Sequence, residues 1–432
     1  MLRWQNWAGN QVCSPVAIER PGTDSELVAI VKQAGAQGQR VKVVGAGHSF
    51  TDVACTDGVQ ISLDNYGRLL RVDRELGRVT VQAGIQLHTL NEALAARGLG
   101  MENLGDIAYQ SIAGAISTST HGTGARFGGL ATQVVGLDLV TADGSVISCS
   151  ADEEPAIFQA ARVGLGALGV LSTVTLQCVP AFNLHAVEER MRLDDVLAHI
   201  DEHVADNDHF EFYWVPHTGW ALTKRNDRTD EPAHGRGRFG EFRERVLFEN
   251  VAFGAVNRVA RMRPSWIPRL AKMLPSTGRS EYVERSDRVF TSPRYVHFYE
   301  MEYSIPREHV VDALRQLTEF VDRSGLLLSF PVEVRFTAPD DIPLSTATGR
   351  PSSYIAVHVY QGMPYEQYFR GVEAVMDPLG GRPHWGKMHY QTAATLAPKY
   401  PQWQAWQAVR LRLDPDGRFA NAYTDRVLGP VG

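Results

Sequence analysis

The sequence predicts an α+β protein of two domains, one over residues 1–180 and the other over residues 181–400. Three observations support this fold class. At 432 residues the chain is long for a single hydrophobic core. In the first half, short strands separated by turn residues follow one early helix. In the second half, strands and helices alternate with strand pairs between them, which is typical of an antiparallel sheet covered by helices.

The elements of the first domain are predicted from local signals along the chain. Residues 23–26, Thr-Asp-Ser-Glu, form a capping box that begins a helix, which weakens at Gly35 and Gly38. A second helix is predicted over 87–97, ending at Gly98. Apolar runs bounded by turn residues predict the strands. These strands are 41–44, 58–64, 69–73, 78–84, two strands within 134–150 around an Asp143-Gly144 hairpin, and one within 163–180.

The second domain has a different pattern. Residues 193–204 are predicted to form one amphipathic helix, because their apolar residues recur at helical spacing. An Arg-rich stretch, residues 224–290, is predicted to be an insertion. The remaining predicted elements are strands at 209–216, 295–306, 326–340 and 353–362, and helices at 307–321 and 366–376.

The composition excludes several kinds of partner. A net charge of −6 gives no reason to expect nucleic acid or another polyanion. The N-terminal residues lack the apolar core of a signal peptide, and no stretch approaches the ~18 apolar residues of a membrane span. The four cysteines are far apart and form no CxxC pair, so neither a metal site nor a disulfide framework is expected. This use of cysteine best fits a protein of the reducing cytoplasm.

A glycine turn follows the strand 41–44. Residues 45–47, Gly-Ala-Gly, favour a dinucleotide-binding turn, and Asp64 lies at about the spacing of a ribose-binding acid. The rest of that fingerprint is absent, because Phe50 replaces the third glycine and no helix is predicted to follow. Taken alone, this run could be a simple tight turn. Residues 117–124 add hydroxyl and N–H donors, so the two segments together indicate a large dinucleotide bound in an extended form.

Several motifs resemble one flavoprotein family, in sequence and in order. VGAGHSFTDVACTDGV, TVQAG, NLGDIAYQSIAGAISTSTHGTG and GALGVLSTVTL are similar to the FAD domain of the vanillyl-alcohol-oxidase superfamily. NWAGN, FPVEVRF, YIAVHVY, RPHWGK and LDPDGRFANAYTDRVL resemble the sugar-lactone oxidoreductases, the L-gulono-1,4-lactone and D-arabinono-1,4-lactone oxidases or dehydrogenases. The resemblance implies a two-domain vanillyl-alcohol-oxidase-like fold. It places a PCMH-type FAD-binding domain over 1–180, a substrate domain over 181–400, and a segment 401–432 that returns to the FAD domain.

The resemblance also implies a covalently held FAD. In the family, the histidine after Gly-x-Gly is joined to the C8α methyl of the isoalloxazine ring, and His48 occupies that position. A neutral imidazole is nucleophilic, and attachment there is expected to make the flavin a stronger oxidant. The alternative is noncovalent FAD, as in plant relatives with leucine at this position. The other implied cofactor contacts are Val44, Gly45, Ala46, Gly47, Ser49, Gly105, Ser111, Gly114, Ser117, Thr118, Thr120, His121, Gly122, Gly169, Val170, Asn421 and Tyr423.

The predicted strands of the second domain share an ionisable face. Glu333 and Arg335 are two apart in a strand and so lie on one face, opposite their apolar neighbours. The same alternation gives residues 353–362 a polar face that includes His358, and RPHWGK adds His384 and Lys387. Each of these alone would be read as a structural ion pair or a solvated face. Their combination, matching the family's substrate motifs, favours a substrate site.

The resemblance implies a reaction for this site. A secondary alcohol carbon of a sugar lactone or polyol would pass a hydride to flavin N5. For an aldonolactone the carbon is C2, and the product tautomerises to an enediol of the ascorbate type. Arg335 and Lys387 would stabilise negative charge, Glu333 would orient Arg335 and bind hydroxyls, and His358 or Lys387 would accept the hydroxyl proton. Oxidation of an open polyol, as by the related alditol oxidases, is the alternative.

The electron acceptor is left open between O2 and a carrier such as a cytochrome. Gly105 matches the family position thought to govern oxygen access, where plant dehydrogenases carry alanine. Glycine has no side chain to obstruct oxygen, so the sequence permits oxidase activity without requiring it.

Three other interpretations have less support. HIDEH, residues 199–203, fits a zinc-peptidase pattern, but Ile200 within it belongs to the apolar face and no third ligand is signalled. A surface helix is the simpler interpretation. A sugar-binding protein without catalysis is a second alternative. Residues 251–275 could form a membrane-surface helix, but their three prolines interrupt a long helix, so cap helices over the substrate site are favoured.

Overall fold

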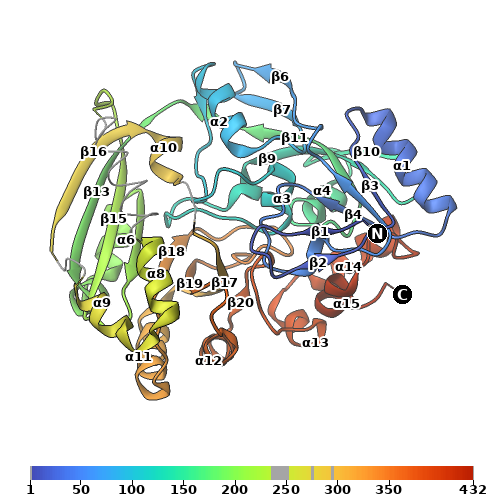
Figure 1. Cartoon of the computed structure of the whole chain (residues 1–432). Coiled ribbons are helices and arrows are strands. Elements are labelled where there is room, and N and C mark those ends of the chain that lie inside the picture. Colours follow the sequence, from blue (N-terminus) through green and yellow to red (C-terminus); the bar gives the residue numbers. More distant parts are fainter. Residues whose placement is uncertain (1, 235–252, 274–276, 293–295, 432) are drawn as a thin grey trace.

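The structure is a computed structural model that describes residues 2–234, 253–273, 277–292 and 296–431. The chain forms two bodies side by side (Figure 1). One contains the N-terminal strands together with the C-terminal helices, and the other is built on one large antiparallel sheet.

The first domain contains two main sheets. The parallel sheet has the order β3-β5-β4, and the antiparallel sheet has the order β10-β9-β11-β7-β6. The parallel strands are β3 (Ala17–Glu19), β5 (Val59–Ser62) and β4 (Val41–Val44); the antiparallel strands are β10 (Val146–Ser150), β9 (Val134–Val140), β11 (Val170–Gln177), β7 (Arg78–Gln82) and β6 (Leu69–Asp73). Two short pairs, β1 (Trp4–Gln5) with β2 (Val12–Cys13) and β8 (Leu99–Gly100) with β12 (Val179–Pro180), complete the strands.

Four helices accompany these sheets: α1 (Asp24–Ala36), α2 (Leu87–Ala95), α3 (Ile112–Ser117) and α4 (Pro155–Ala161). The predicted capping box at Thr23 is present, since Thr23 and Glu26 each accept a hydrogen bond from the other's backbone N–H. The sequence did not predict α3, which lies in a segment read as polar and irregular. Its apolar residues are buried in the core and Ser111 caps it, so tertiary packing decides the local structure there.

Over its described residues, the second domain is built on an eight-stranded sheet in the order β16-β13-β15-β14-β18-β19-β17-β20, and every neighbouring pair is antiparallel. Apolar residues of its central strands pack against α5, α6, α11 and α12 on one face, which confirms the predicted helix-covered sheet. The strands are β13 (Asn183–Arg192), β14 (His209–Trp214), β15 (Trp220–Thr229), β16 (Arg279–Arg285), β17 (Phe298–Pro306), β18 (Val332–Thr337), β19 (Ser352–Tyr360) and β20 (Arg382–Pro383); the helices are α5 (Leu193–Ala198), α6 (Ile200–Asp206), α11 (Val310–Ser324) and α12 (Glu366–Met376).

Two predictions for this domain were wrong. The helix expected over 193–204 is broken at His199, whose φ of −117° and ψ of 23° separate α5 from α6. The stretch 224–290 is not wholly an insertion, because β15 and β16 are strands of the main sheet. Between these two strands lie α8 (Phe253–Met262), a 3-10 turn that begins at Pro264, and α9 (Ile267–Met273). Residues 235–252 and 274–276 of this stretch are outside the described ranges. Helix α10 (Ser286–Phe290) follows β16.

The C-terminal helices α13 (Ala393–Leu396), α14 (Trp403–Leu413) and α15 (Ala422–Leu428) pack into the core of the first domain. Trp406, Phe419 and Val427 are buried there. The chain enters this core before residue 401, since Trp385 already belongs to it. Strand β4 is tied to the C-terminal segment by a hydrogen bond from Val41 N to Arg418 O of 2.8 Å.

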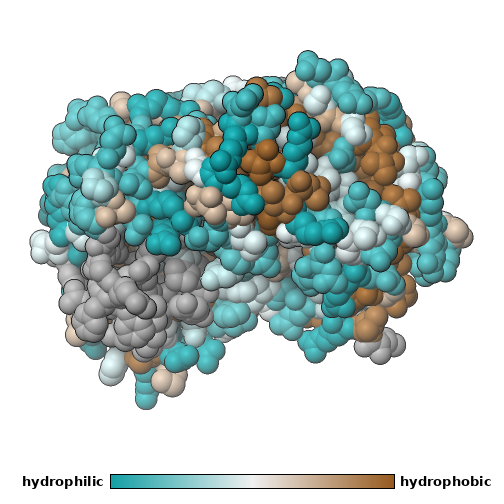
Figure 2. Space-filling view, turned by 90° about the horizontal axis from the view of Figure 1, so that it is seen from above, coloured by the Kyte–Doolittle hydropathy of each residue, from teal (hydrophilic) through white to brown (hydrophobic). Residues whose placement is uncertain are grey.

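The surface is mixed in polarity. On the face seen in Figure 2, hydrophobic side chains gather over the centre and the half formed by the first domain, while hydrophilic ones dominate the other half. Of the helices in the described ranges, none combines the length and the apolar character needed to cross a bilayer.

Candidate active site

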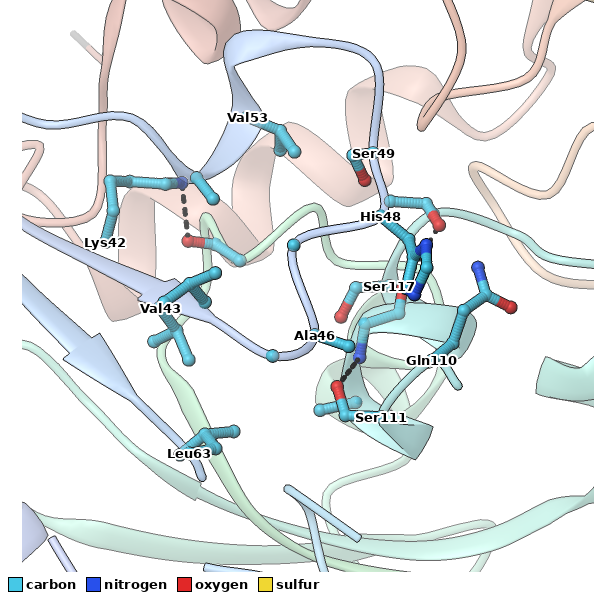
Figure 3. Close-up of a pocket in the computed structure, with 18 of the residues that line it drawn as sticks. Lys42, Val43, Ala46, His48, Ser49, Val53, Leu63, Gln110, Ser111 and Ser117 are labelled. Atoms are coloured by element: carbon cyan, nitrogen blue, oxygen red, sulfur yellow. Dashed lines mark hydrogen bonds between the residues drawn. The ribbon is translucent and has the colours of Figure 1, made fainter. Parts of the chain in front are cut away.

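The turn after β4 lines one side of a cavity in the first domain (Figure 3). Residues 43–49 face α3 across this cavity, and Gly169, just before β11, and Leu171 in β11 also line it. A Cβ added to Gly45 would lie 1.9 Å from Ser111 Oγ, so only glycine allows the turn and α3 to approach this closely. A 3-10 turn and then β5 follow, as expected for a fold other than the Rossmann type.

The lining of this cavity suits a dinucleotide. Backbone N–H groups of the turn and the hydroxyls of Ser111 and Ser117 supply donors for phosphate oxygens. Lys42, at the end away from His48 in Figure 3, adds an amine, and its Nζ donates to Gly166 O and Phe419 O at 3.1 Å each. Burial lowers the pKa of Lys42 to about 7. Lys42 was not among the predicted site residues, although a lysine inside an apolar strand is a visible signal in the sequence.

His48 stands where this cavity meets a second, polar one, since its side chain lines both. Its ring centroid lies 5.6 Å from that of Trp7, which stacks on His297 at 4.4 Å. Burial, and secondarily the neighbouring His297, lower the pKa of His48 to about 4. The imidazole is therefore neutral, and so nucleophilic, at physiological pH.

The polar cavity brings the four predicted catalytic residues together between the two domains. Glu333, Arg335, His358 and Lys387 come from the second domain, on β18, on β19 and after β20. The wall from the first domain includes Gly105, Thr118, Thr120 and His121, which were predicted as cofactor contacts.

Arg335 is held by two carboxylates. Its Nε donates to Glu211 Oε2 at 2.8 Å, and its Nη2 forms a short ion pair with Glu333 Oε1. Tyr213 OH donates to the same Glu333 oxygen at 2.8 Å. Burial alone would lower the pKa of Arg335, but the two carboxylates outweigh it and hold the pKa well above its usual value. Arg335 is thus a fixed cation, as expected, while Glu211 and Tyr213 were not predicted.

Lys387 lies between two glutamates of β17. Its Nζ is 2.5 Å from Glu300 Oε1 and 2.6 Å from Glu302 Oε2. Burial would raise the pKa of Glu300, but Lys387 and His358 outweigh it and hold that pKa at about 2. The pKa of Glu302 is likewise far below its usual value, because Lys387 and His121 outweigh its burial. Both acids were missed, although their two-residue spacing is the signal that identified Glu333 and Arg335.

Two histidines of the cavity differ in their surroundings. His358 Nε2 lies 3.3 Å from Glu300 Oε1, so a proton placed on this nitrogen has a carboxylate to stabilise it. His384 Nδ1 accepts a hydrogen bond from Gly386 N at 3.0 Å. Burial, followed by the charge of Lys387, lowers the pKa of His384 to about 3, so this ring is neutral.

Comparison with known proteins identifies the family to which this chain belongs. The profile of the D-arabinono-1,4-lactone oxidase family matches residues 174–427, and that of an FAD-binding domain matches residues 15–150. The chain belongs to the D-arabinono-1,4-lactone oxidase family. It is 51% identical to the L-gulono-1,4-lactone dehydrogenase of Mycobacterium tuberculosis, over 99% of both chains. It is 37% identical to the L-gulonolactone oxidase of Bos taurus, over 99% of this chain and 98% of the other.

Solved structures of lower identity show the fold. A solvent-stable cholesterol oxidase superposes with a TM-score of 0.82 at 18% identity, over 99% of this chain and 97% of the other. Cholesterol oxidase from B. sterolicum gives a TM-score of 0.80 at the same identity, over 99% and 96%. The predicted fold and the FAD-binding domain are therefore confirmed for this member of the lactone-oxidase family.

Some residues predicted to contact FAD lie outside both cavities of this family member. Val170 is the first residue of β11 and follows Gly169 in the sequence. Gly122 lines a third cavity, which Arg335 also lines. Asn421 Nδ2 donates to Asp52 O at 2.8 Å and to Cys55 O at 2.9 Å. Tyr423 OH donates to Trp385 O at 2.6 Å. Asn421 and Tyr423 thus brace the loop after His48 and the turn before Lys387, and their contact with a cofactor stays a prediction.

The zinc-peptidase interpretation gains no support. His199 lies at the break between α5 and α6, and His203 stacks on Phe210 with centroids 4.9 Å apart. Over the ranges that the structure describes, the histidine and acidic side chains that lie close enough together to hold a metal ion are found around Lys387. Neither His199 nor His203 is among them.

Proposed function

We propose that the protein oxidises a sugar 1,4-lactone, such as L-gulono-1,4-lactone, at C2 with FAD as the immediate oxidant. The observation that carries the proposal is the polar cavity at the domain boundary, where Arg335, Lys387 and His358 converge beside His48. The likeness to lactone dehydrogenases and oxidases over the whole chain supports the choice of substrate class.

Each residue of the polar cavity has its own role in the proposed reaction. FAD, when bound, accepts the hydride. Arg335 and Lys387 present N–H donors to substrate oxygens that gain negative charge, and both are held in place by buried carboxylates. Glu333, fixed by Tyr213, orients Arg335 and accepts hydrogen bonds from substrate hydroxyls. His358 receives the hydroxyl proton, and Glu300, whose Oε1 lies 3.3 Å from His358 Nε2, stabilises the resulting imidazolium.

We propose further that FAD is attached covalently through His48. The neutral imidazole and its position at the junction of the two cavities support this bond. Acid-precipitated wild-type protein is expected to stay yellow, and His48→Ala is expected to release the flavin into the supernatant. Release of flavin from the wild type would refute the covalent bond and leave FAD binding intact.

The electron acceptor is proposed to be O2 or a carrier such as a cytochrome, with no obstruction from Gly105. The location is proposed to be the cytoplasm, and membrane attachment is not favoured. Cell fractionation followed by immunodetection tests both statements, because a membrane-bound fraction resistant to salt would contradict them.

A panel of lactones and polyols tests the reaction itself. Anaerobic addition of a 1,4-lactone is expected to bleach the flavin absorbance, at a rate followed by stopped-flow mixing. Faster bleaching by xylitol or sorbitol than by any lactone would favour an alditol oxidase. Binding of sugars without any bleaching would favour the non-catalytic alternative.

A further inference from the structure

Five ionisable side chains form a continuous chain across the polar cavity. His358 contacts Glu300, Glu300 and Glu302 share Lys387, and Glu302 Oε1 lies 3.3 Å from His121 Nε2. The side chains of His121 and Glu302 are only 3% and 2% exposed, so water does not screen a charge on either of them. The arrangement has one histidine at each end, but the two ends are not equivalent.

Hydrogen bonding fixes the protons on His121. Its Nδ1 lies 2.9 Å from Gly122 O, and because a carbonyl can only accept, Nδ1 must carry a proton. In a neutral ring Nε2 would then present a lone pair to the Glu302 carboxylate, which is repulsive. A proton must therefore lie between Nε2 and Glu302. At His358 the corresponding Nδ1 contact, to Pro331 O, is longer, at 3.3 Å, so it does not fix a proton on Nδ1 and leaves that nitrogen free to accept one.

The surroundings of His121 favour the proton on the imidazole. The ring stacks on Tyr354 with centroids 3.5 Å apart, and a cation is attracted to an aromatic face. The pKa of Glu302 lies well below its usual value, because Lys387 and then His121 outweigh its burial, so its carboxyl is ionised. A further ionisable neighbour, His384, has its ring centroid 5.9 Å away and is neutral.

This proton changes the charge of the cavity. Glu300 and Glu302 carry two negative charges against the single positive charge of Lys387. Without a further cation the group would be negative as a whole, and a negative group opposes both an anionic substrate oxygen and a reduced flavin. A protonated His121 offsets Glu302 and leaves Lys387 to be balanced by Glu300 alone.

We propose that His121 is a positioning residue that remains protonated, paired with Glu302, and keeps the Glu300–Lys387–Glu302 group neutral during oxidation of the substrate. The inference rests on the proposed function for its role in catalysis. The protonation itself, and its effect on the ease of flavin reduction, do not depend on which substrate the enzyme takes.

The first test is the flavin midpoint potential of the holoenzyme, measured by reductive titration with xanthine and xanthine oxidase. His121→Gln removes the cation and leaves Glu302, so the equilibrium constant for two-electron reduction is expected to fall at least tenfold, about 30 mV. His121→Gln with Glu302→Gln removes both charges and is expected to return within threefold of the wild type, about 15 mV. His384→Gln, which removes a neutral ring from the same wall, is the matched control and should leave the potential within the same threefold range.

Rescue by the double variant separates a charge role from a structural one. A double variant whose potential is as low as that of His121→Gln, or lower, would overturn the proposal, because loss of a packing residue is not repaired by a second substitution. An unchanged potential in His121→Gln alone would also overturn it.

The second test observes the protonation of His121 directly in the wild-type protein. Wild-type holoenzyme labelled with 15N-histidine is examined by long-range proton–nitrogen NMR, with the His121 signals assigned by their loss in His121→Gln. Both ring nitrogens are expected to carry protons at pH 7.5. An unprotonated Nε2 at that pH would overturn the proposal. If no lactone bleaches the flavin while both tests give the expected results, the proposed substrate is wrong and the His121 inference stands.

Discussion

Replacement of Lys387 by methionine is predicted to destabilise the protein at neutral pH through the two acids it leaves behind. Glu300 and Glu302 are 4% and 1% exposed, and both lie within 2.6 Å of Lys387 Nζ. Removing one partner of a buried ion pair typically costs about 3–5 kcal/mol, because the other charge is left unpaired. Since Lys387 serves two acids, we expect Lys387→Met to lower the free energy of unfolding by an amount in that range.

The pH dependence of this loss follows from the pKa of Glu300. In the wild type that pKa is depressed to about 2, so the pair contributes its full stability above about pH 4.5, and the contribution disappears as pH falls toward 2. In Lys387→Met, burial without the cation raises the pKa of both acids, and they take up protons as the pH falls from 7. The difference between variant and wild type should therefore shrink between pH 7 and pH 4.5.

The assay is urea unfolding of holoenzyme at pH 7.0 and pH 4.5, followed by tryptophan fluorescence, with flavin content matched between samples. Arg323→Met is the control, because Arg323 and Glu319 form an exposed pair with side chains 75% and 66% accessible. That pair should contribute at most about 0.5 kcal/mol. A Lys387→Met variant within 1 kcal/mol of the wild type at pH 7.0 would show that Glu300 and Glu302 are not buried as charges.

Three further predictions concern the two cavities. Arg335→Ala should slow anaerobic flavin reduction by about 10², the usual effect of losing a charge-stabilising donor, and a stopped-flow rate near that of the wild type would remove Arg335 from the mechanism. Gly105→Ala should slow reoxidation in air-saturated buffer while reduction by lactone stays largely intact; the new Cβ lies 3.1 Å from His121 O, and equal reoxidation rates would place the oxygen gate elsewhere. Gly45→Ala should lower the flavin content of purified protein, because its Cβ collides with Ser111 Oγ, and a full complement of flavin would contradict the tight approach of the two segments.

Local patterns in the sequence were sufficient for much of the second domain. The predicted helix 366–376 is α12 at the same bounds, because its apolar spacing coincides with the face that packs against the sheet. Alternation in β18 correctly placed Val332, Val334 and Phe336 in the core and Glu333 on the opposite face. In both cases the determining interactions lie within one segment and repeat with its period.

Other features depend on partners distant in the sequence. The two-residue spacing of Glu300 and Glu302 places both on one face of a strand, but their common partner Lys387, 85 residues after Glu302, becomes apparent only in the fold. Lys42 stands out in the sequence as a lysine in an apolar strand, but its place in a cavity wall depends on distant contacts such as the one to Phe419 O, 377 residues away. Helix α3 required the core that buries its apolar side, because its small residues alone favour no single structure.

The packing of α14 and α15 into the first domain has a consequence for the order of folding. The core that contains β4 and α4 includes Trp406 and Val427, so the ribosome must deliver residues on both sides of the second domain before that core can close. The second domain, continuous in sequence from β13 to β20, can fold first. The FAD-binding half should then mature late and slowly, because its contacts span nearly the full chain. FAD is accordingly expected to bind only after the C-terminal helices have been synthesised and packed.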